Sequence, residues 1–184
     1  QKYVNRIKWR LHHLNKNWLA IICGETGSGK SYSAISLGED IGPLYVVFTS
    51  LEFMTLINSG RLKRGDVIVF DEAGVGMSSR EWYSVQNKVL GSVLQTFRNM
   101  NVAVIFTTPN LSFVDVQARK LFHAYLETAY LNQEEEVAYL KAYDIQVNSR
   151  FDKIYFKHPR FTDENGCSVA MSHFAVKKPS EKMI

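Results

Sequence analysis

Four short apolar runs constrain the fold of this 184-residue chain more than any other feature. They are rich in Val, Ile or Phe and too short for helices, and they lie at Leu19–Cys23, Leu44–Phe48, Val67–Phe70 and Val102–Phe106. Continuous apolar runs of this length are typical of strands that are buried on both faces of a sheet. We therefore expect at least four buried strands.

Segments of helical character separate these strands. Ser31–Ile41 follows a glycine-rich turn, and Leu51–Asn58 has Ser50 as its expected N-cap. The longest helix begins at a capping box, Ser78-x-x-Glu81, and its apolar side chains recur every three or four residues as far as Met100. Strand and helix thus alternate to residue 108, which predicts an α/β fold with three layers and a mostly parallel sheet.

The pattern changes after Asn110. We expect a short helix around Val114–Phe122, then a C-terminal antiparallel hairpin formed by Ala124–Leu131 and Val137–Val147 at the edge of the sheet. Apolar residues become sparse from Pro159 onward. This organisation predicts a basic N-terminal segment over 1–16, a central domain over 17–158 and a tail or arm over 159–184.

The turn after the first strand carries the most specific motif. Residues 24–31 read GETGSGKS and match in full the phosphate-binding loop, G-x-x-x-x-G-K-[ST]. Glycines let several backbone N–H groups converge on phosphate oxygens, and the following helix adds its positive N-terminal end. Lys30 would reach the β and γ phosphates of ATP, and the Ser31 hydroxyl would hold Mg²⁺. The expected nucleotide-binding residues are Gly24, Glu25, Thr26, Gly27, Ser28, Gly29, Lys30, Ser31 and Tyr32.

A pair of carboxylates follows the third apolar run. Asp71 matches the Walker B aspartate and would hold Mg²⁺, while Glu72 would be the base that polarises the attacking water. The same residues satisfy the D-x-x-G pattern of GTPases, but Asn87-Lys88 lacks the aspartate that guanine recognition needs. Small-molecule kinases carry an arginine-rich lid, and none is evident in the sequence. The pair therefore favours an ATPase.

Two further catalytic residues are less firmly placed by sequence. Thr108 closes the fourth run, where a polar group can sense the γ phosphate, although Thr-Pro-Asn is also a good turn. Arg98 precedes that run and is our candidate for an arginine finger that acts on a neighbouring subunit, with Arg80 and Arg119 as rivals. Arg98 would equally serve to offset the helix dipole.

Charge and composition restrict the partners and the compartment. The net charge is +4, and the basic excess lies at both ends of the chain. Ser149–Phe161 alternates basic and aromatic residues, a pattern that suits nucleic acid but also suits an edge strand with exposed lysines. Two cysteines are too few for a disulfide framework, and no apolar run is long enough to span a bilayer. We therefore expect a soluble protein of the host cytoplasm.

Taken together, GETGSGKS, the Asp71-Glu72 pair and the arginine before a strand that ends in Thr-Thr resemble the FtsK and HerA superfamily of P-loop ATPases, RecA-like proteins of the ASCE division. The small size is similar to viral genome-packaging ATPases and to Zot-like proteins. The chain departs from the superfamily at Thr108, where glutamine is usual.

This resemblance implies ATP and Mg²⁺ as cofactors and a homo-oligomeric ring, commonly a hexamer, with double-stranded DNA in its pore. Our interpretation is an ATP-driven DNA translocase used for genome packaging. Two alternatives remain open. One is a Zot-like or secretion-type assembly ATPase with a capsid or membrane-protein partner, and the other is a slow nucleotide switch.

Overall fold

The computed structural model describes residues 2–71 and 100–179. Its helices are α1 (Lys2–His12), α2 (Lys30–Ile41), α3 (Ser50–Asn58), the 3₁₀ turn η2 (Leu111–Phe113) and α5 (Val116–Arg119). Its strands are β1 (Trp18–Cys23), β2 (Leu44–Val47), β3 (Val67–Phe70), β4 (Ala103–Thr108), β5 (Ala124–Asn132), β6 (Val137–Asn148), β7 (Lys153–Lys157), β8 (Arg160–Thr162), β9 (Ser168–Ala170) and β10 (His173–Lys177). The long helix expected over 78–100 lies almost entirely outside the described residues. None of the described helices is long and apolar enough to cross a membrane.

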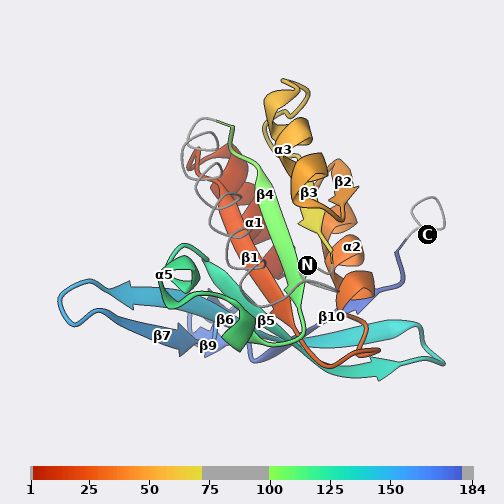
Figure 1. Ribbon diagram of the computed structural model, residues 1–184. Helices are drawn as coiled ribbons and strands as arrows, with labels where there is room; N and C mark the ends of the chain where they lie inside the picture. Colours follow the sequence, from red (N-terminus) through yellow and green to blue (C-terminus); the bar gives the residue numbers. More distant parts are fainter. Residues whose placement is uncertain (1, 72–99, 180–184) are drawn as a thin grey trace.

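One sheet organises the molecule, with strand order β10-β6-β5-β1-β4-β3-β2, and β7 also pairs with β6. The strands from β5 to β2 in this order are parallel, whereas β6 pairs antiparallel with β5, β7 and β10. The expected α/β fold, with a mostly parallel sheet and a C-terminal antiparallel hairpin, is confirmed (Figure 1).

The two faces of the sheet are buried in two separate clusters, as the continuous apolar strands require. Alternate residues of β1 show this clearly: Leu19, Ile21 and Cys23 pack with α3 and α5, while Ala20 and Ile22 pack with α1 and α2. The sheet therefore lies between two helical layers. The side chains at the ends of its strands lie at the margins of the sheet.

Both ends of the chain contribute to the core. Tyr3, Ile7 and Leu11 recur at four-residue steps on one face of α1 and are buried against the sheet. Strand β10 extends the sheet beyond β6 and buries Val176. The segments that we expected to lie outside the central domain are thus partly packed into it.

Three local expectations differ from the structure. The N-cap of α3 is Thr49 rather than Ser50, because the Thr49 hydroxyl accepts the Glu52 N–H and the Glu52 carboxylate accepts the Thr49 N–H. The single helix expected around 114–122 is replaced by η2 and α5, which Val114 and Asp115 separate. The hairpin is not at the edge, since β10 and β7 pair with its outer strand.

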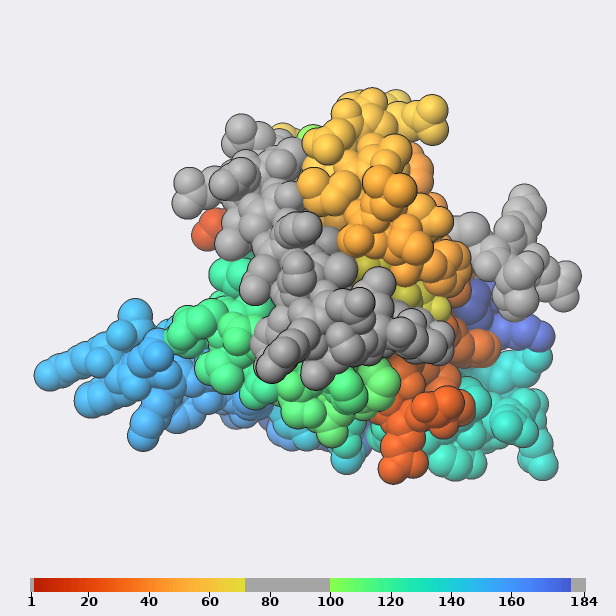
Figure 2. Space-filling view, in the orientation of Figure 1, coloured from red at the N-terminus to blue at the C-terminus, as the bar shows by residue number. Residues whose placement is uncertain are grey.

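The end of β6 and the strand β7 project from the body as an arm, which Figure 2 shows at the left of the molecule. The opposite end of β6 follows the turn from β5, which Figure 1 shows beside the beginning of α2. One twelve-residue strand therefore joins the two regions.

Candidate functional site

The phosphate-binding loop lies between the last residue of β1, Cys23, and the first residue of α2, Lys30. Gly27 and Gly29 have φ values of 79° and 84°, a left-handed conformation that glycine adopts without a steric penalty. A bond from the Ser28 N–H to the Glu25 carbonyl, 3.1 Å long, tightens the loop. The N-cap of α2 is Gly29, which has no side chain to cap the helix, so the first N–H groups of α2 are directed toward the loop, as binding of an anion requires.

The Lys30 side chain is buried within this loop, with the residue only 8% exposed. Its Nζ donates to the Glu25 carbonyl oxygen over 2.7 Å. A carbonyl satisfies only one of the three ammonium donors, which leaves two for phosphate oxygens. The sequence-predicted role of Lys30 therefore fits its position.

Strand β5 supports the loop from the side. The Thr128 hydroxyl lies 2.7 Å from the Ser28 hydroxyl and 3.4 Å from the Cys23 carbonyl oxygen. A Cβ added to Gly24 would lie 1.8 Å from the Thr128 Oγ1, so only glycine fits at the start of the loop. The pairing of β5 with β6 shifts register between Thr128 and Tyr130. Thr128 was not anticipated, because nothing in the sequence links residue 128 to the motif.

Tyr32 connects the first turn of α2 to the β5–β6 turn rather than lying open to solvent. Its hydroxyl donates to the Glu136 carbonyl oxygen over 2.7 Å, and the Glu136 carboxylate accepts from Lys178 over 2.6 Å. Burial and the neighbouring Glu136 raise the pKa of Tyr32. The expected contact between Tyr32 and nucleotide stays a prediction.

Cys23 lies directly before the loop, but its environment argues against a role as nucleophile. Burial, and secondarily the charge of Glu127, raise the pKa of the Cys23 thiol to about 12. The thiol is therefore protonated at neutral pH and acts as a small apolar side chain.

Asp71 follows β3 at the same edge of the sheet, with β4 lying between β3 and the loop-bearing β1. The residue is 7% exposed, and its Oδ1 accepts a hydrogen bond of 2.7 Å from the Thr107 hydroxyl. None of the described basic side chains pairs with this carboxylate. A buried carboxylate without a counter-charge is costly, so the position favours a cation.

The donors at this edge fit Mg²⁺. Ser31 and Asp71 supply a hydroxyl and a carboxylate oxygen, and Mg²⁺ usually takes one or two protein ligands with water and phosphate. Within residues 2–71 and 100–179, no group of three or more His, Cys, Asp or Glu side chains could form a dedicated metal cage. The arrangement thus suits a metal that arrives with its nucleotide.

Thr107, which was not predicted, is the threonine that contacts Asp71. Residues alternate between the two faces of a strand, and Ile105 belongs to the α1 and α2 face while Phe106 belongs to the α3 face. Thr107 therefore shares the face of the loop helix, and Thr108 lies on the opposite face with its hydroxyl 3.4 Å from the Asn110 carbonyl oxygen. The period-two pattern indicates that Thr107 and Thr108 lie on opposite faces, but not which of the two faces meets α2.

The other predicted catalytic residues are not placed by the structure. Glu72, Arg98 and Arg80 lie outside the described residues. Arg119 is described, and its Nε donates to the Val114 carbonyl oxygen at the start of α5 over 2.9 Å.

The glycine-rich loop between β1 and α2, with the carboxylate of Asp71 at the same sheet edge, defines a P-loop domain of the three-layer α/β class. Comparison with known families then identifies the particular group. The family described as zonular occludens toxin (Zot) matches residues 47–154, more than half of the chain, and the chain belongs to this family. The match includes Asp71, Thr107 and the β5–β6 hairpin but begins after the phosphate-binding loop.

Several solved structures are similar to this chain. One is the N-terminal domain of zonular occludens toxin from Neisseria meningitidis, with 14% identity and a TM-score of 0.44 over 76% of this chain and 93% of that one. Another is the DNA-packaging ATPase from Sulfolobus Turreted Icosahedral Virus, with 13% identity and a TM-score of 0.43 over 77% and 97%. A third is the genome-packaging NTPase from Sulfolobus turreted icosahedral virus 2 in complex with AMPPCP, with 13% identity and a TM-score of 0.46 over 78% and 98%. A search of curated proteins gave no match.

Proposed function

We propose that this chain hydrolyses ATP and, in a homo-oligomeric ring, couples hydrolysis to the movement of double-stranded DNA. The observation that carries the proposal is the buried Lys30 within a left-handed glycine loop, at the same sheet edge as the buried carboxylate of Asp71, with which none of the described basic side chains pairs. This combination of a cation, converging N–H groups and a buried carboxylate suits Mg-ATP. We further propose that it acts in the host cytoplasm, with a capsid or membrane-protein partner.

The residues of the site have separate roles in this proposal. The loop N–H groups and Lys30 bind the phosphates, and Ser31 and Asp71 hold the metal. Bound Mg²⁺ supplies positive charge that offsets the charge developing on the γ phosphate. Glu72 orients the attacking water and accepts its proton, and the Thr107 hydroxyl fixes the orientation of the Asp71 carboxylate.

The arm supports contact with a nucleic acid. Phe151 and Tyr155 are 62% and 44% exposed, whereas Phe156, 40% exposed, packs edge-on against Tyr125. The exposed lysines Lys153 and Lys157 lie on the same strand, β7. Basic groups can follow a phosphate backbone while aromatic rings stack on bases or pack against sugars.

The decisive experiment compares the ATPase rate of the assembled protein with and without duplex DNA. We expect stimulation by DNA and loss of all activity in Lys30→Ala, because no other described cation lies within the loop. Lys153→Ala with Lys157→Ala should weaken DNA binding. The slope of log affinity against log salt concentration, about −0.9 for each phosphate contact, should become less steep. The control is Lys63→Ala with Arg64→Ala, which removes the same charge from the turn before β3.

The Zot family match favours a second candidate, an assembly ATPase that moves protein at a membrane. Its signature would be ATP hydrolysis that duplex DNA leaves unchanged, together with a salt-independent association with the protein partner. DNA-stimulated turnover that the arm variants abolish would exclude this candidate.

A further inference from the structure

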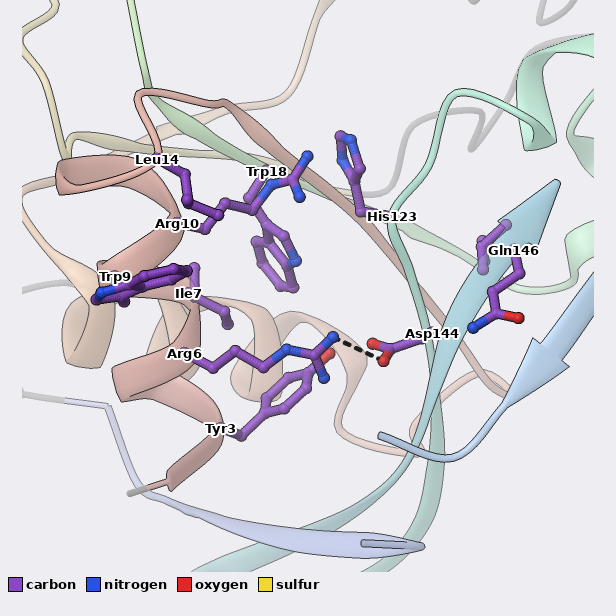
Figure 3. A pocket seen from close by; sticks show the side chains of 11 residues that line it. Tyr3, Arg6, Ile7, Trp9, Arg10, Leu14, Trp18, His123, Asp144 and Gln146 are labelled. Atoms are coloured by element: carbon purple, nitrogen blue, oxygen red, sulfur yellow. Dashed lines mark hydrogen bonds and ion pairs between the residues drawn. The ribbon is translucent and has the colours of Figure 1, made fainter. Parts of the chain in front are cut away.

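A cavity lined by polar and aromatic side chains lies at the end of the sheet where the parallel strands begin, opposite the end that carries the phosphate-binding loop. It has a volume of about 300 Å³ and lies between α1, the beginning of β1 and the part of β6 that leads into the arm (Figure 3). Asp144 of β6 pairs with Ala124 at the start of β5, which places the cavity where the parallel strands begin. The proposed ATPase function makes no use of it.

Tyr3 provides the first sign that the cavity has a ligand. The residue is 3% exposed, and its hydroxyl is one of the few described buried polar groups with no hydrogen-bond partner. Burial, and secondarily the charge of Asp144, raise the pKa of Tyr3, so the hydroxyl is a proton donor at neutral pH. An unsatisfied buried hydroxyl is costly, and a ligand oxygen would remove that cost.

The charges around the cavity are not balanced. Arg6 pairs with Asp144 over 2.8 Å, whereas the described structure offers Arg10 no carboxylate. The Arg10 Nε donates to the Asn17 carbonyl oxygen over 2.7 Å, which fixes the guanidinium, and no described side chain accepts from its other N–H groups. Burial and the charge of Arg6 lower the pKa of Arg10, and the charge of Asp144 opposes this shift in part. The two outer nitrogens of Arg10 are spaced so that they can donate to two oxygens of one carboxylate or phosphate.

His123 adds a third donor on the same side. Its Nδ1 accepts the Leu19 N–H over 3.0 Å, so the neutral ring carries its proton on Nε2. Figure 3 shows the guanidinium of Arg10, on α1, and the imidazole of His123, on the residue directly before β5, extending toward the same side of the view. Burial lowers the pKa of His123 to about 4, which keeps this tautomer above pH 5.

We infer that this cavity binds a small organic oxyanion, a carboxylate or phosphate carried by a planar ring. Arg10, Tyr3 and His123 supply the donors for its oxygens, and Trp18 and Trp9 supply aromatic surface for the ring. The single carboxylate of the cavity, Asp144, is neutralised by Arg6. A ring with one charged group matches a cavity of this size and polarity.

The test is a titration of the full chain with benzoate and with phenyl phosphate, followed by amide and indole NMR signals. Binding here moves the signals of Trp18 and Leu19, whereas binding at the loop moves those of Gly27 and Gly29. The ligand that binds more tightly identifies the carboxylate or the phosphate as the natural group.

Substitutions separate the donors. Arg10→Gln should weaken binding by roughly 10-fold or more and Tyr3→Phe by about 5-fold, as expected for a charged and a neutral hydrogen bond. Lys8→Gln is the matched control, because it removes one charge from an exposed position of the same helix. Tyr3→Phe should leave the unfolding midpoint unchanged or raise it, because the hydroxyl has no partner in the free protein.

Three results of the binding assays would overturn the inference, and a fourth concerns the NMR signals. They are binding that Arg10→Gln and Lys8→Gln weaken equally, benzyl alcohol binding as tightly as benzoate, and inorganic phosphate binding as tightly as phenyl phosphate. Signal changes confined to Gly27 and Gly29 would also reject it, since the anions would then occupy only the phosphate-binding loop.

Discussion

Replacing Gly24 with alanine tests how β5 supports the phosphate-binding loop. The new Cβ would lie 1.8 Å from the Thr128 Oγ1 and 2.6 Å from the Ser28 Oγ. The serine hydroxyl can rotate away, but Thr128 is β-branched and lies in a strand that pairs on both sides. The clash must therefore displace the strand or the loop.

The magnitude follows from the contacts that would be lost and compressed. Overpacking of this kind costs about 1–3 kcal/mol, and loss of the hydrogen bond between Thr128 and Ser28 adds about 1 kcal/mol. We expect Gly24→Ala to lower the free energy of unfolding by about 2–4 kcal/mol in the absence of nucleotide. In a Thr128→Ala background the same change should cost less than about 1 kcal/mol, because rotation of the Ser28 hydroxyl relieves the 2.6 Å contact with its Oγ and the contact with the Cβ of residue 128 is 3.2 Å.

Urea unfolding of the four proteins in this cycle gives the coupling free energy directly. Gly27→Ala is the control, because Gly27 has a positive φ and nothing within 4 Å of the added Cβ. Its cost of about 1–2 kcal/mol comes from backbone strain and should not change when Thr128 is truncated. If Gly24→Ala costs the same in both backgrounds, the proposed support of the loop by Thr128 is refuted.

Three further predictions concern catalysis and pH. Thr107→Val should lower the ATP hydrolysis rate about 10-fold, because the Asp71 carboxylate loses its hydrogen bond from the hydroxyl. Thr108→Val should have little effect. A larger loss in Thr108→Val would restore the sensor role that the sequence suggested. His123 has a folded pKa lowered from 6.5 to about 4, so its neutral form contributes stability that is fully present above pH 6.5 and lost as the pH falls to 4. His123→Gln should remove that part of the pH dependence of urea unfolding, and an unchanged profile would contradict the assignment. Glu72→Gln and Arg98→Ala should each bind ATP but not hydrolyse it, and mixing them should restore some activity if Arg98 acts on a neighbouring subunit; in a verified mixed oligomer, absence of rescue would argue against Arg98.

The sequence predicted the central strands closely because their burial on both faces leaves a local signal. Val67–Phe70 was predicted at its observed bounds, and the loop after Cys23 was recognised from glycine spacing alone. These features depend on residues that are neighbours in the chain. The same holds for α1, whose four-residue spacing of Tyr3, Ile7 and Leu11 was visible but was overlooked among its basic residues.

Features that depend on distant segments could not be predicted. Thr128 reaches Ser28 only because β5 lies beside β1, and β10 joins the sheet through five residues of the segment 159–184, which we expected to be a tail or arm. The threonine that contacts Asp71 required knowledge of which strand face meets α2. The register of a strand and the face on which each residue lies are set by tertiary packing. The motifs could therefore locate the site at one end of the sheet, but not the residues of other strands that support it.

The length of β6 has a mechanical consequence. Its twelve residues, at about 3.3 Å each, span roughly 40 Å. One end follows the turn where Tyr32 bonds to Glu136, its middle is clamped to α1 through Asp144 and Arg6, and its far end forms the arm with β7 (Figure 1). Asp144 lies about 23 Å from the first residue of β6 and about 13 Å from its last, so a tilt of about 5° at that ion pair would move the two ends by about 2 Å and about 1 Å in opposite directions. A displacement at the β5–β6 turn would therefore reach the arm reduced to about half and opposite in direction, and it would carry the strands that pair with β6 along with it.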